Sequence, residues 1–149
     1  MRFYLFVLFI CIVLIPNSTK SQSTLEAIAT QKASFKLYIN GIEKVEGEIR
    51  IAIFDSKNKY TKDPIHAVVL PISDTKVELE LENMSYGEYA IAVYHDQNKN
   101  GKLDTNLLGM PKEKYGFSNN ARGKFGPASW DDAVFEIASP TKVAEISIK

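Results

Sequence analysis

The sequence predicts an all-β fold: a single antiparallel β-sandwich of about seven strands with one long ordered loop. Three observations support this fold class. Apolar and polar residues alternate with a period of two through most of the chain after residue 34. Turn-forming residues, such as Asn40-Gly41, separate the alternating segments. Helical periodicity is almost absent from the same region, and 149 residues are enough for one domain.

The alternating segments also indicate where two of the strands lie. Residues 77–81 alternate strictly between apolar residues and glutamates, so this strand should have one face in water. Residues 88–95 are apolar on both faces, which favours a central strand. One short helix is expected near 129–133, where Ser129 can cap the first turn and Asp132 follows three residues later. The expected strands cover residues 35–39, 49–53, 65–72, 77–81, 88–95, 134–137 and 143–148.

The first residues of the chain differ from the rest. Arg2 is followed by an apolar run over residues 3–15 and then by a polar stretch, which is typical of a secretory signal peptide. We therefore expect a signal peptide at 1–22, a sandwich domain at 34–149, and a secreted or periplasmic location. An uncleaved membrane anchor is the alternative, but the apolar run is shorter than the roughly 20 residues that span a bilayer.

Cysteine usage and charge narrow the possible classes further. Cys11 is the only cysteine and lies inside the apolar run, so the mature domain should have no disulfide, no thiol nucleophile and no thiolate metal site. Such a domain depends on its core, or on a bound ion, for stability. The 18 basic and 18 acidic residues balance, which gives no indication of a nucleic-acid partner. No membrane span is expected once the signal peptide is removed.

Residues 95–106, HDQNKNGKLDTN, form the segment with the clearest chemistry. An aspartate and two asparagines lie two residues apart, Gly101 follows, and another aspartate comes three residues later, as in the D-x-[DN]-x-[DN]-G calcium loop. Calcium takes six to eight oxygen ligands, and alternate side chains on a tight turn can point inward together. A backbone carbonyl after the glycine is a further ligand in such loops. The expected ligands are Asp96, Asn98, Asn100, Lys102, Asp104 and Glu113.

The loop departs from the calcium pattern at its twelfth position. Leu107 stands where a bidentate glutamate is expected, and Glu113 is the candidate for the missing carboxylate. Two or three carboxylates predict a weak Ca²⁺ site, with a dissociation constant of roughly 0.1–1 mM. A metal-free turn is the alternative, because Asn and Asp side chains also bond to nearby backbone groups in ordinary turns.

Aromatic residues gather in the long loop over residues 107–132. Tyr115, Phe117 and Trp130 could form the floor of a groove for a small molecule or a glycan. The alternative is a small core in which these side chains hold the loop against one end of the sandwich. The aromatic side chains of this loop therefore form either the ligand site of a carrier or a small core that holds the loop in place.

No catalytic motif is present in the sequence. It contains no H-E-x-x-H, no P-loop and no G-x-S-x-G, and only two histidines. A hydrolase centred on His95 and Asp96, with Ser118 as nucleophile, can be drawn. Strand alternation instead indicates that His95 is a histidine at the rim of the core. We therefore expect no catalytic residues, with the hydrolase kept as an alternative.

Three segments and the calcium-like loop together resemble a known bacterial family. They are GEIRIAIFD at 47–55, GEYAIAVYHD at 87–96 and GMPKEKYGFSNNA at 109–121. The family consists of secreted proteins and is catalogued as domain of unknown function 2141, and the likeness runs from about residue 35 to 149. It implies secretion and a sandwich fold, and it carries no activity.

A more distant similarity involves residues 87–104. Transthyretin-like and collagen-adhesin-type sandwiches often have a G-x-Y strand before a D-x-N-x-N-G turn. This similarity implies an immunoglobulin-like or transthyretin-like sandwich used as an adhesive or structural module. The sequence thus predicts a binding or structural module of the cell envelope with a calcium loop and an unidentified protein or glycan partner.

Overall fold

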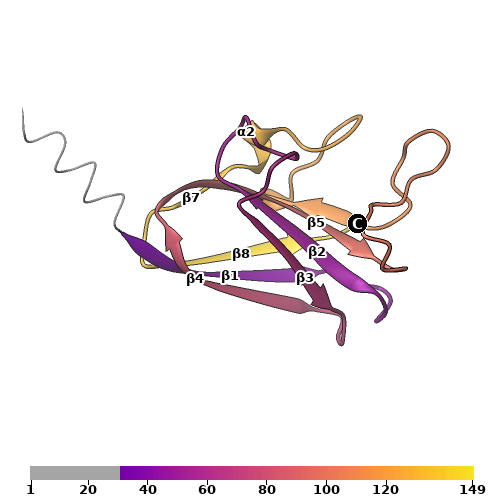
Figure 1. The fold of residues 1–149 in the computed structure, drawn as a ribbon, viewed down its shortest axis with the longest axis horizontal. Helices are drawn as coiled ribbons and strands as arrows, with labels where there is room; N and C mark the ends of the chain where they lie inside the picture. Colours follow the sequence, from indigo (N-terminus) through magenta and orange to yellow (C-terminus); the bar gives the residue numbers. More distant parts are fainter. Residues whose placement is uncertain (1–30) are drawn as a thin grey trace, which may run out of the picture.

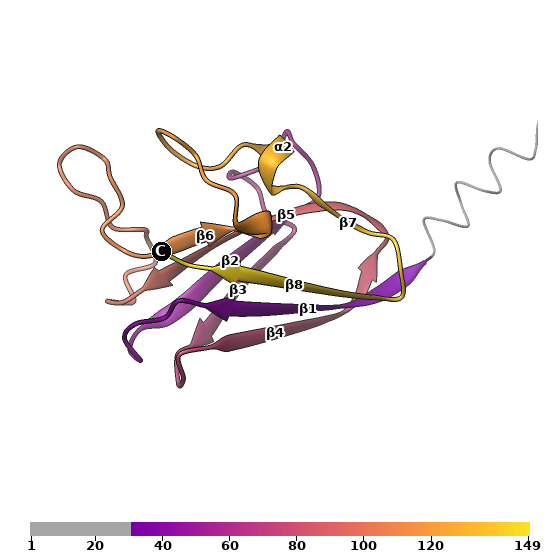
Figure 2. The same ribbon diagram turned by 180° about the vertical axis from the view of Figure 1, so that it is seen from behind.

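The computed structural model describes residues 31–149 and contains eight strands and two short helices. The strands are β1 (Lys32–Asn40), β2 (Glu48–Phe54), β3 (His66–Pro71), β4 (Val77–Ser85), β5 (Gly87–Asp96), β6 (Tyr115–Phe117), β7 (Phe135–Ile137) and β8 (Thr141–Ser147), and the helices are η1 (Ser118–Asn120) and α2 (Trp130–Ala133). One sheet has the order β4-β1-β8 and the other β3-β2-β5-β6, with β7 also paired to β5 (Figures 1 and 2). The predicted all-β sandwich is confirmed.

All seven expected strands are present, and β6 is the additional one. Neighbouring strands are antiparallel, except that β1 and β8 run parallel. The strand β6 has only three residues, too few to show an alternating pattern. Its central residue must be small, because a Cβ atom added at Gly116 would lie 2.8 Å from Cγ2 of Ile146 in β8.

The main core lies between the two sheets and takes every second residue of the long strands. In β1, Phe35, Leu37 and Ile39 are completely buried and alternate with half-buried neighbours. The glutamates of residues 77–81 are exposed, as their alternation predicted. The strand β5 lies between β2 and β6 and is buried on both faces, which confirms its predicted central position.

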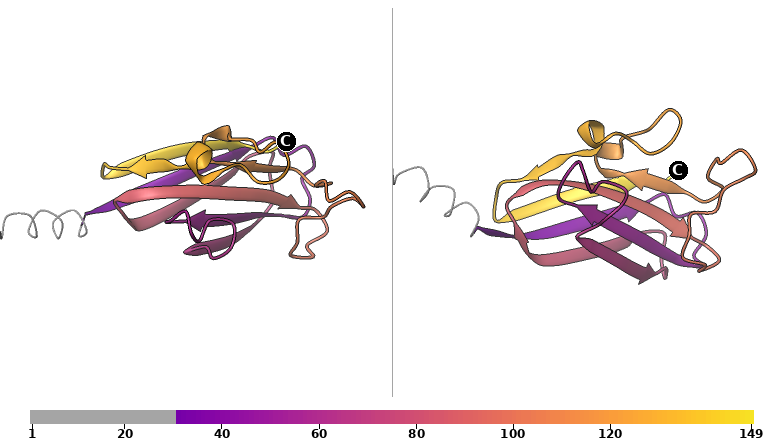
Figure 3. Two further views of the ribbon diagram at one scale, coloured as in Figure 1. Left: turned by 90° about the horizontal axis from the view of Figure 1, so that it is seen from above. Right: turned by 45° about the horizontal axis from the view of Figure 1, so that its top comes forward.

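A second, smaller core covers the outer face of the β3-β2-β5-β6 sheet. Phe54 projects from that face and meets the ring of Tyr60 edge-on at 5.3 Å, and Tyr60 meets Trp130 in the same way at 5.7 Å. The loop that carries Tyr60 and the helix α2 lie together on this side (Figure 3). Helix α2 is capped as expected, because Ser129 Oγ accepts the backbone N–H of Asp132 at 3.2 Å.

The start of the domain differs slightly from the expected boundary. β1 begins at Lys32, before residue 34, and Ala33 is buried opposite Met84. The register between β1 and β4 shifts between Ala33 and Phe35, opposite Asn83, which has a φ of 63°. Because of this irregularity, the end of β4 and the start of β1 do not follow the period-two alternation of the sequence. The expected signal peptide and Cys11 lie outside the described residues. Within 31–149, no helix has the length and hydropathy needed to cross a membrane.

Candidate functional site

The candidate site lies at the carboxyl end of the central strand β5, on the outer face of its sheet. Alternation turns His95 toward the main core and Asp96 outward, yet the side chain of Asp96 is completely buried. Arg50 of the neighbouring strand β2 places its Nε 2.8 Å from Oδ2 of Asp96. The same guanidinium places Nη2 2.6 Å from Oε1 of Glu48, so one arginine forms ion pairs with two carboxylates across the strand pair.

Asp96 also accepts hydrogen bonds from the loop that follows it. The backbone N–H of Gly101 donates to Oδ2 at 2.7 Å, and that of Asn100 donates to Oδ1 at 3.0 Å. Burial alone would raise the pKa of Asp96, but these N–H groups and the Arg50 guanidinium hold it below its ordinary value. Asp96 is therefore a fixed negative charge around which the loop closes.

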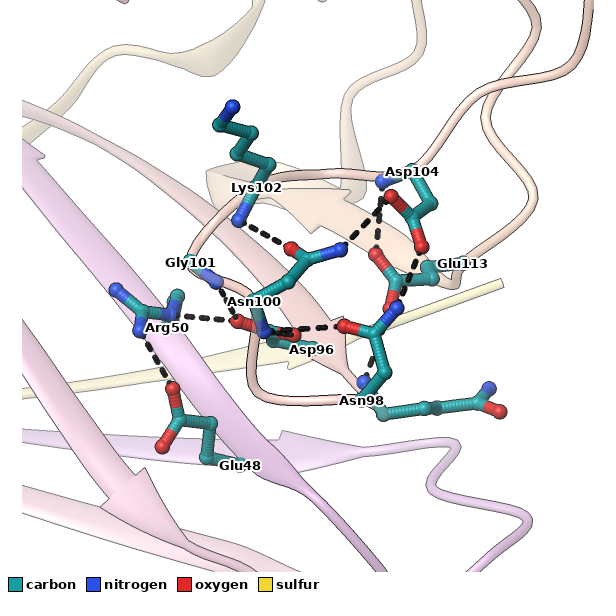
Figure 4. Close-up of polar contacts among 10 residues, drawn as sticks. Glu48, Arg50, Asp96, Asn98, Asn100, Gly101, Lys102, Asp104 and Glu113 are labelled. Carbon is teal, nitrogen blue, oxygen red and sulfur yellow. Dashed lines mark hydrogen bonds and ion pairs between the residues drawn. The ribbon is translucent and has the colours of Figure 1, made fainter.

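The middle of the loop is a chain of side-chain turns (Figure 4). Asn98 Oδ1 accepts the N–H of Asn100 at 3.0 Å, and Asn100 Oδ1 accepts the N–H of Lys102 at 2.8 Å. The amide nitrogens of the same asparagines point at Asp104. Nδ2 of Asn98 lies 2.8 Å from its Oδ2, and Nδ2 of Asn100 lies 3.0 Å from its Oδ1.

Glu113 closes the loop from the far side. Its side chain is almost buried; Oε1 accepts the N–H of Gln97 and Oε2 accepts the N–H of Asp104, both at 2.9 Å. One carboxylate thus joins the two ends of the loop. The structure brings together all six residues predicted as ligands, Asp96, Asn98, Asn100, Lys102, Asp104 and Glu113.

The donor set matches calcium in chemical type. The groups are carboxylate, amide and carbonyl oxygens, and a carboxylate oxygen that accepts one N–H keeps a second lone pair. Two groups do not match, because Asn98 and Asn100 turn nitrogen rather than oxygen toward Asp104. Among residues 31–149, no three His, Cys, Asp or Glu side chains are grouped as a metal site. An ion bound here would require both amides to rotate.

The residues considered for a hydrolase do not contact one another as a triad. His95 Nε2 bonds to the backbone carbonyl of Glu46 at 2.7 Å, at the rim of the main core. Ser118 is buried; its hydroxyl accepts the N–H of Ile91 at 2.9 Å and donates to the carbonyl of Ala133. The proton of the candidate nucleophile is therefore committed to the backbone rather than to a histidine.

The aromatic residues of the long loop have two different environments. Tyr115 and Phe117 meet edge-on at 5.9 Å and line a cavity of about 460 Å³. Phe117 is 6% exposed and Trp130 8% exposed, and both pack in the second core. The packing alternative therefore describes Phe117 and Trp130, whereas the half-buried Tyr115 offers part of its surface to the cavity.

A second cavity of about 360 Å³ continues this space along the outer face of the sheet. Ala52 and Ala92 line it, and Leu103, Phe117 and Pro127 line both cavities. We call the two together the outer groove. Sequence reasoning missed this groove and the role of Arg50. Two small residues that point outward from β2 and β5, Ala52 and Ala92, lie opposite each other and leave space on this face. They were the signal in the sequence that could have indicated the groove.

Comparison with known proteins places the chain in a family. No curated protein and no solved structure matches it significantly. One family model, described as "Uncharacterized protein conserved in bacteria (DUF2141)", matches residues 37–145. This confirms the resemblance that the motifs indicated, while the more distant likeness to transthyretin-like sandwiches stays a prediction. Because the match covers most of the sequence, the chain belongs to the DUF2141 family of bacterial proteins.

Proposed function

We propose that this chain is a secreted or periplasmic β-sandwich module of the cell envelope, and that its loop over residues 96–113 takes up one calcium ion to fix a binding surface. The observation that supports this most directly is the hydrogen-bonded loop that links all six expected ligand residues at the end of one central strand. The leader-like start of the sequence supports the location.

In this proposal the roles of the loop residues are unequal. Asp104, Asn98, Asn100 and the Lys102 carbonyl would hold the ion, because Asp96 is already neutralised by Arg50. Calcium would supply a positive charge at the one loop aspartate that lacks a cationic partner among the described residues. With so few free carboxylates, the dissociation constant should lie at roughly 0.1–1 mM.

Calcium at this position would stiffen the loop that projects beyond it. The N–H of Lys112 donates to the carbonyl of Asp104 at 2.8 Å, and Thr105 bridges to Pro111, so residues 105–111 form a short hairpin tip on the same base. Fixing Asp104 therefore fixes the tip. A rigid, projecting loop on a sandwich is a common form of binding surface.

Calcium titration of the full chain by calorimetry tests the proposal. We expect one bound ion, and a melting temperature that rises with about 10 mM calcium and falls back with a chelator, since a tenfold excess of ion over a dissociation constant of about 1 mM stabilises by about 1.4 kcal/mol. Asp104→Asn should abolish both effects. Asp63→Asn, at an exposed position in the loop between β2 and β3, is the matched control and should change neither. Absence of heat and of a thermal shift in the unmodified chain would overturn the calcium site.

A second candidate function is transport of a small apolar ligand in the outer groove. The observation that favours it is the cavity of about 460 Å³, which lies within the roughly 300–1,000 Å³ range of ligand pockets. Ala92→Leu should fill the floor of the adjoining cavity and abolish the fluorescence of an apolar probe such as anilinonaphthalene sulfonate. Val143→Leu, on the other sheet, is the control. Equal probe fluorescence in both variants would exclude the groove as the ligand site.

A further inference from the structure

Two loop tips that line the outer groove expose large apolar side chains. Leu107 and Phe125 are fully exposed at 106% and 101%, Leu108 is 87% exposed and Met110 is 57% exposed. The loops that carry them, residues 105–111 and 123–127, both project from the sandwich on the side of the β5–β6 sheet (Figures 1 and 2). Single exposed apolar residues are common, but four on two adjacent tips form a patch that indicates an interaction.

The hairpin tip is held in shape by hydrogen bonds to the side chain and the backbone of Asn106. Asn106 Oδ1 accepts the N–H groups of Leu108 and Met110 at 2.9 and 3.0 Å, and the N–H of Asn106 bonds to the carbonyl of Met110 at 2.8 Å. Most backbone N–H groups of the tip therefore have a partner inside the loop. Such a tip can enter a membrane interface without leaving many unpaired N–H groups.

The charges around the tips are strongly asymmetric, although the whole chain is neutral. Both acidic side chains of this region accept hydrogen bonds within the loop, Asp104 from two amides and Glu113 from two backbone N–H groups. Lys99, Lys102, Lys112 and Lys124 are exposed, and none forms an ion pair with another described residue. A hydrogen bond leaves a carboxylate charged, so this region carries the positive charges of four lysines against the negative charges of Asp104 and Glu113, a net positive charge.

We propose that these two tips dock the domain onto an anionic lipid bilayer, with Leu107, Leu108, Met110 and Phe125 in the interface and the lysines against the headgroups. Apolar side chains flanked by basic ones are the composition of interfacial membrane anchors. The cores of protein interfaces are instead depleted in lysine. Each lysine near an anionic surface adds to the attraction, and salt weakens it.

This inference names a partner for the envelope module and rests on the proposed function only in placing the chain beside a membrane. It does not need the calcium site, because lysines and apolar side chains supply the contact. Calcium binding is measured without lipid, and lipid binding is measured with a chelator present. Failure of one proposal is therefore distinguishable from failure of the other.

The test uses the full chain and a readout that is specific to position. A tryptophan is introduced at the tip in Phe125→Trp and at an exposed site of the opposite sheet in Val143→Trp. Vesicles of phosphatidylcholine, with or without phosphatidylglycerol, carry lipids brominated in their acyl chains, which quench tryptophan within the bilayer. Residues 1–30 and the buried Trp130 are the same in both variants and so cannot create a difference between them.

We expect strong quenching at position 125 with phosphatidylglycerol and chelator, and little at position 143. In the Phe125→Trp background, Leu107→Ser with Leu108→Ser should weaken the apparent affinity at least tenfold. Lys112→Gln with Lys124→Gln, or an increase in salt from about 0.1 to about 1 M, should weaken it as well.

Equal quenching at both positions, or quenching at position 125 only when calcium is present, would overturn the inference. So would concentration-dependent dimerisation that Leu108→Ser abolishes, because the tips would then pack on a second copy.

Discussion

At the scale of single residues, the two aspartates of the loop motif have different roles. Asp96 is completely buried and is neutralised by Arg50, whereas Asp104 is half-buried and accepts amide N–H groups. The motif predicted the bend, since Gly101 has a φ of 80°, and it predicted which side chains converge. It could not predict Arg50, because the register between β2 and β5, and not proximity in the sequence, brings that residue to Asp96.

Replacing Asp96 tests its role as the fixed charge of the loop. Asp96→Asn keeps the shape but leaves the guanidinium with only Glu48, and we expect a loss of unfolding free energy on the order of 2 kcal/mol at neutral pH. The pKa of Asp96 is lowered in the folded state, so its stabilisation is present above the ordinary value of 3.8 and is lost as pH falls through the folded pKa. Urea denaturation at neutral pH and in an acid series measures both effects.

The matched variant is Asp104→Asn, whose side chain has no guanidinium partner. It should change the free energy of unfolding less than Asp96→Asn does when calcium is absent. A larger loss for Asp104→Asn, or an Asp96→Asn variant that keeps the full acid dependence of the unmodified chain, would contradict this assignment.

At the scale of elements, the short segment from β6 through η1 joins parts of the fold that are distant in the sequence. Ser118 bonds to the backbone of Ile91 in β5 and of Ala133 in α2, and Asn120 Oδ1 accepts the N–H of Ser147 in β8 at 2.8 Å. Asn119 and Asn120 both have positive φ, a conformation that asparagine tolerates. The pairing of β6 could not be predicted, because three residues around a glycine carry no periodicity.

Removing the Ser118 hydroxyl should destabilise the centre of the domain. Ser118→Ala leaves the N–H of Ile91 and the carbonyl of Ala133 without their partner in a buried place, at a cost of about 1–3 kcal/mol. Ser139→Ala is the control, because the Ser139 hydroxyl is exposed and bonds only to the nearby Thr141 carbonyl. Thermal and urea denaturation of both variants measure the difference. Equal stability of the two variants would show that another group satisfies the backbone at Ile91.

At the scale of the whole molecule, the fold has three layers where the sequence predicted two. Alternation identified the inward residues of both sheets and hence the main core. It also left outward apolar residues such as Phe54 without a partner, and no local pattern indicated which loop would cover them. Tyr60 comes before β5 in the sequence and Trp130 comes after it, and together they cover Phe54. The second core therefore depends on long-range packing that a short sequence window does not contain.

Tyr60 allows the contribution of this third layer to be measured through pH. Its hydroxyl is buried and has no hydrogen-bond partner within residues 31–149, and burial, with a smaller effect of Asp132, raises its pKa to about 12. The unfolded chain releases this proton near pH 10, so the folded state loses stability as pH rises from about 10 to about 12.

Tyr60→Phe removes both the unpaired hydroxyl and the titration. We expect it to be as stable as the unmodified chain or about 1 kcal/mol more stable at neutral pH, and to lose less stability at alkaline pH. Tyr38→Phe, on β1 of the other sheet, is the control, and urea midpoints at neutral and alkaline pH are the measurement. If the third layer unfolded independently of the sandwich, Tyr60→Phe would leave the global midpoint unchanged at every pH, since only interactions that break in the global transition contribute to it.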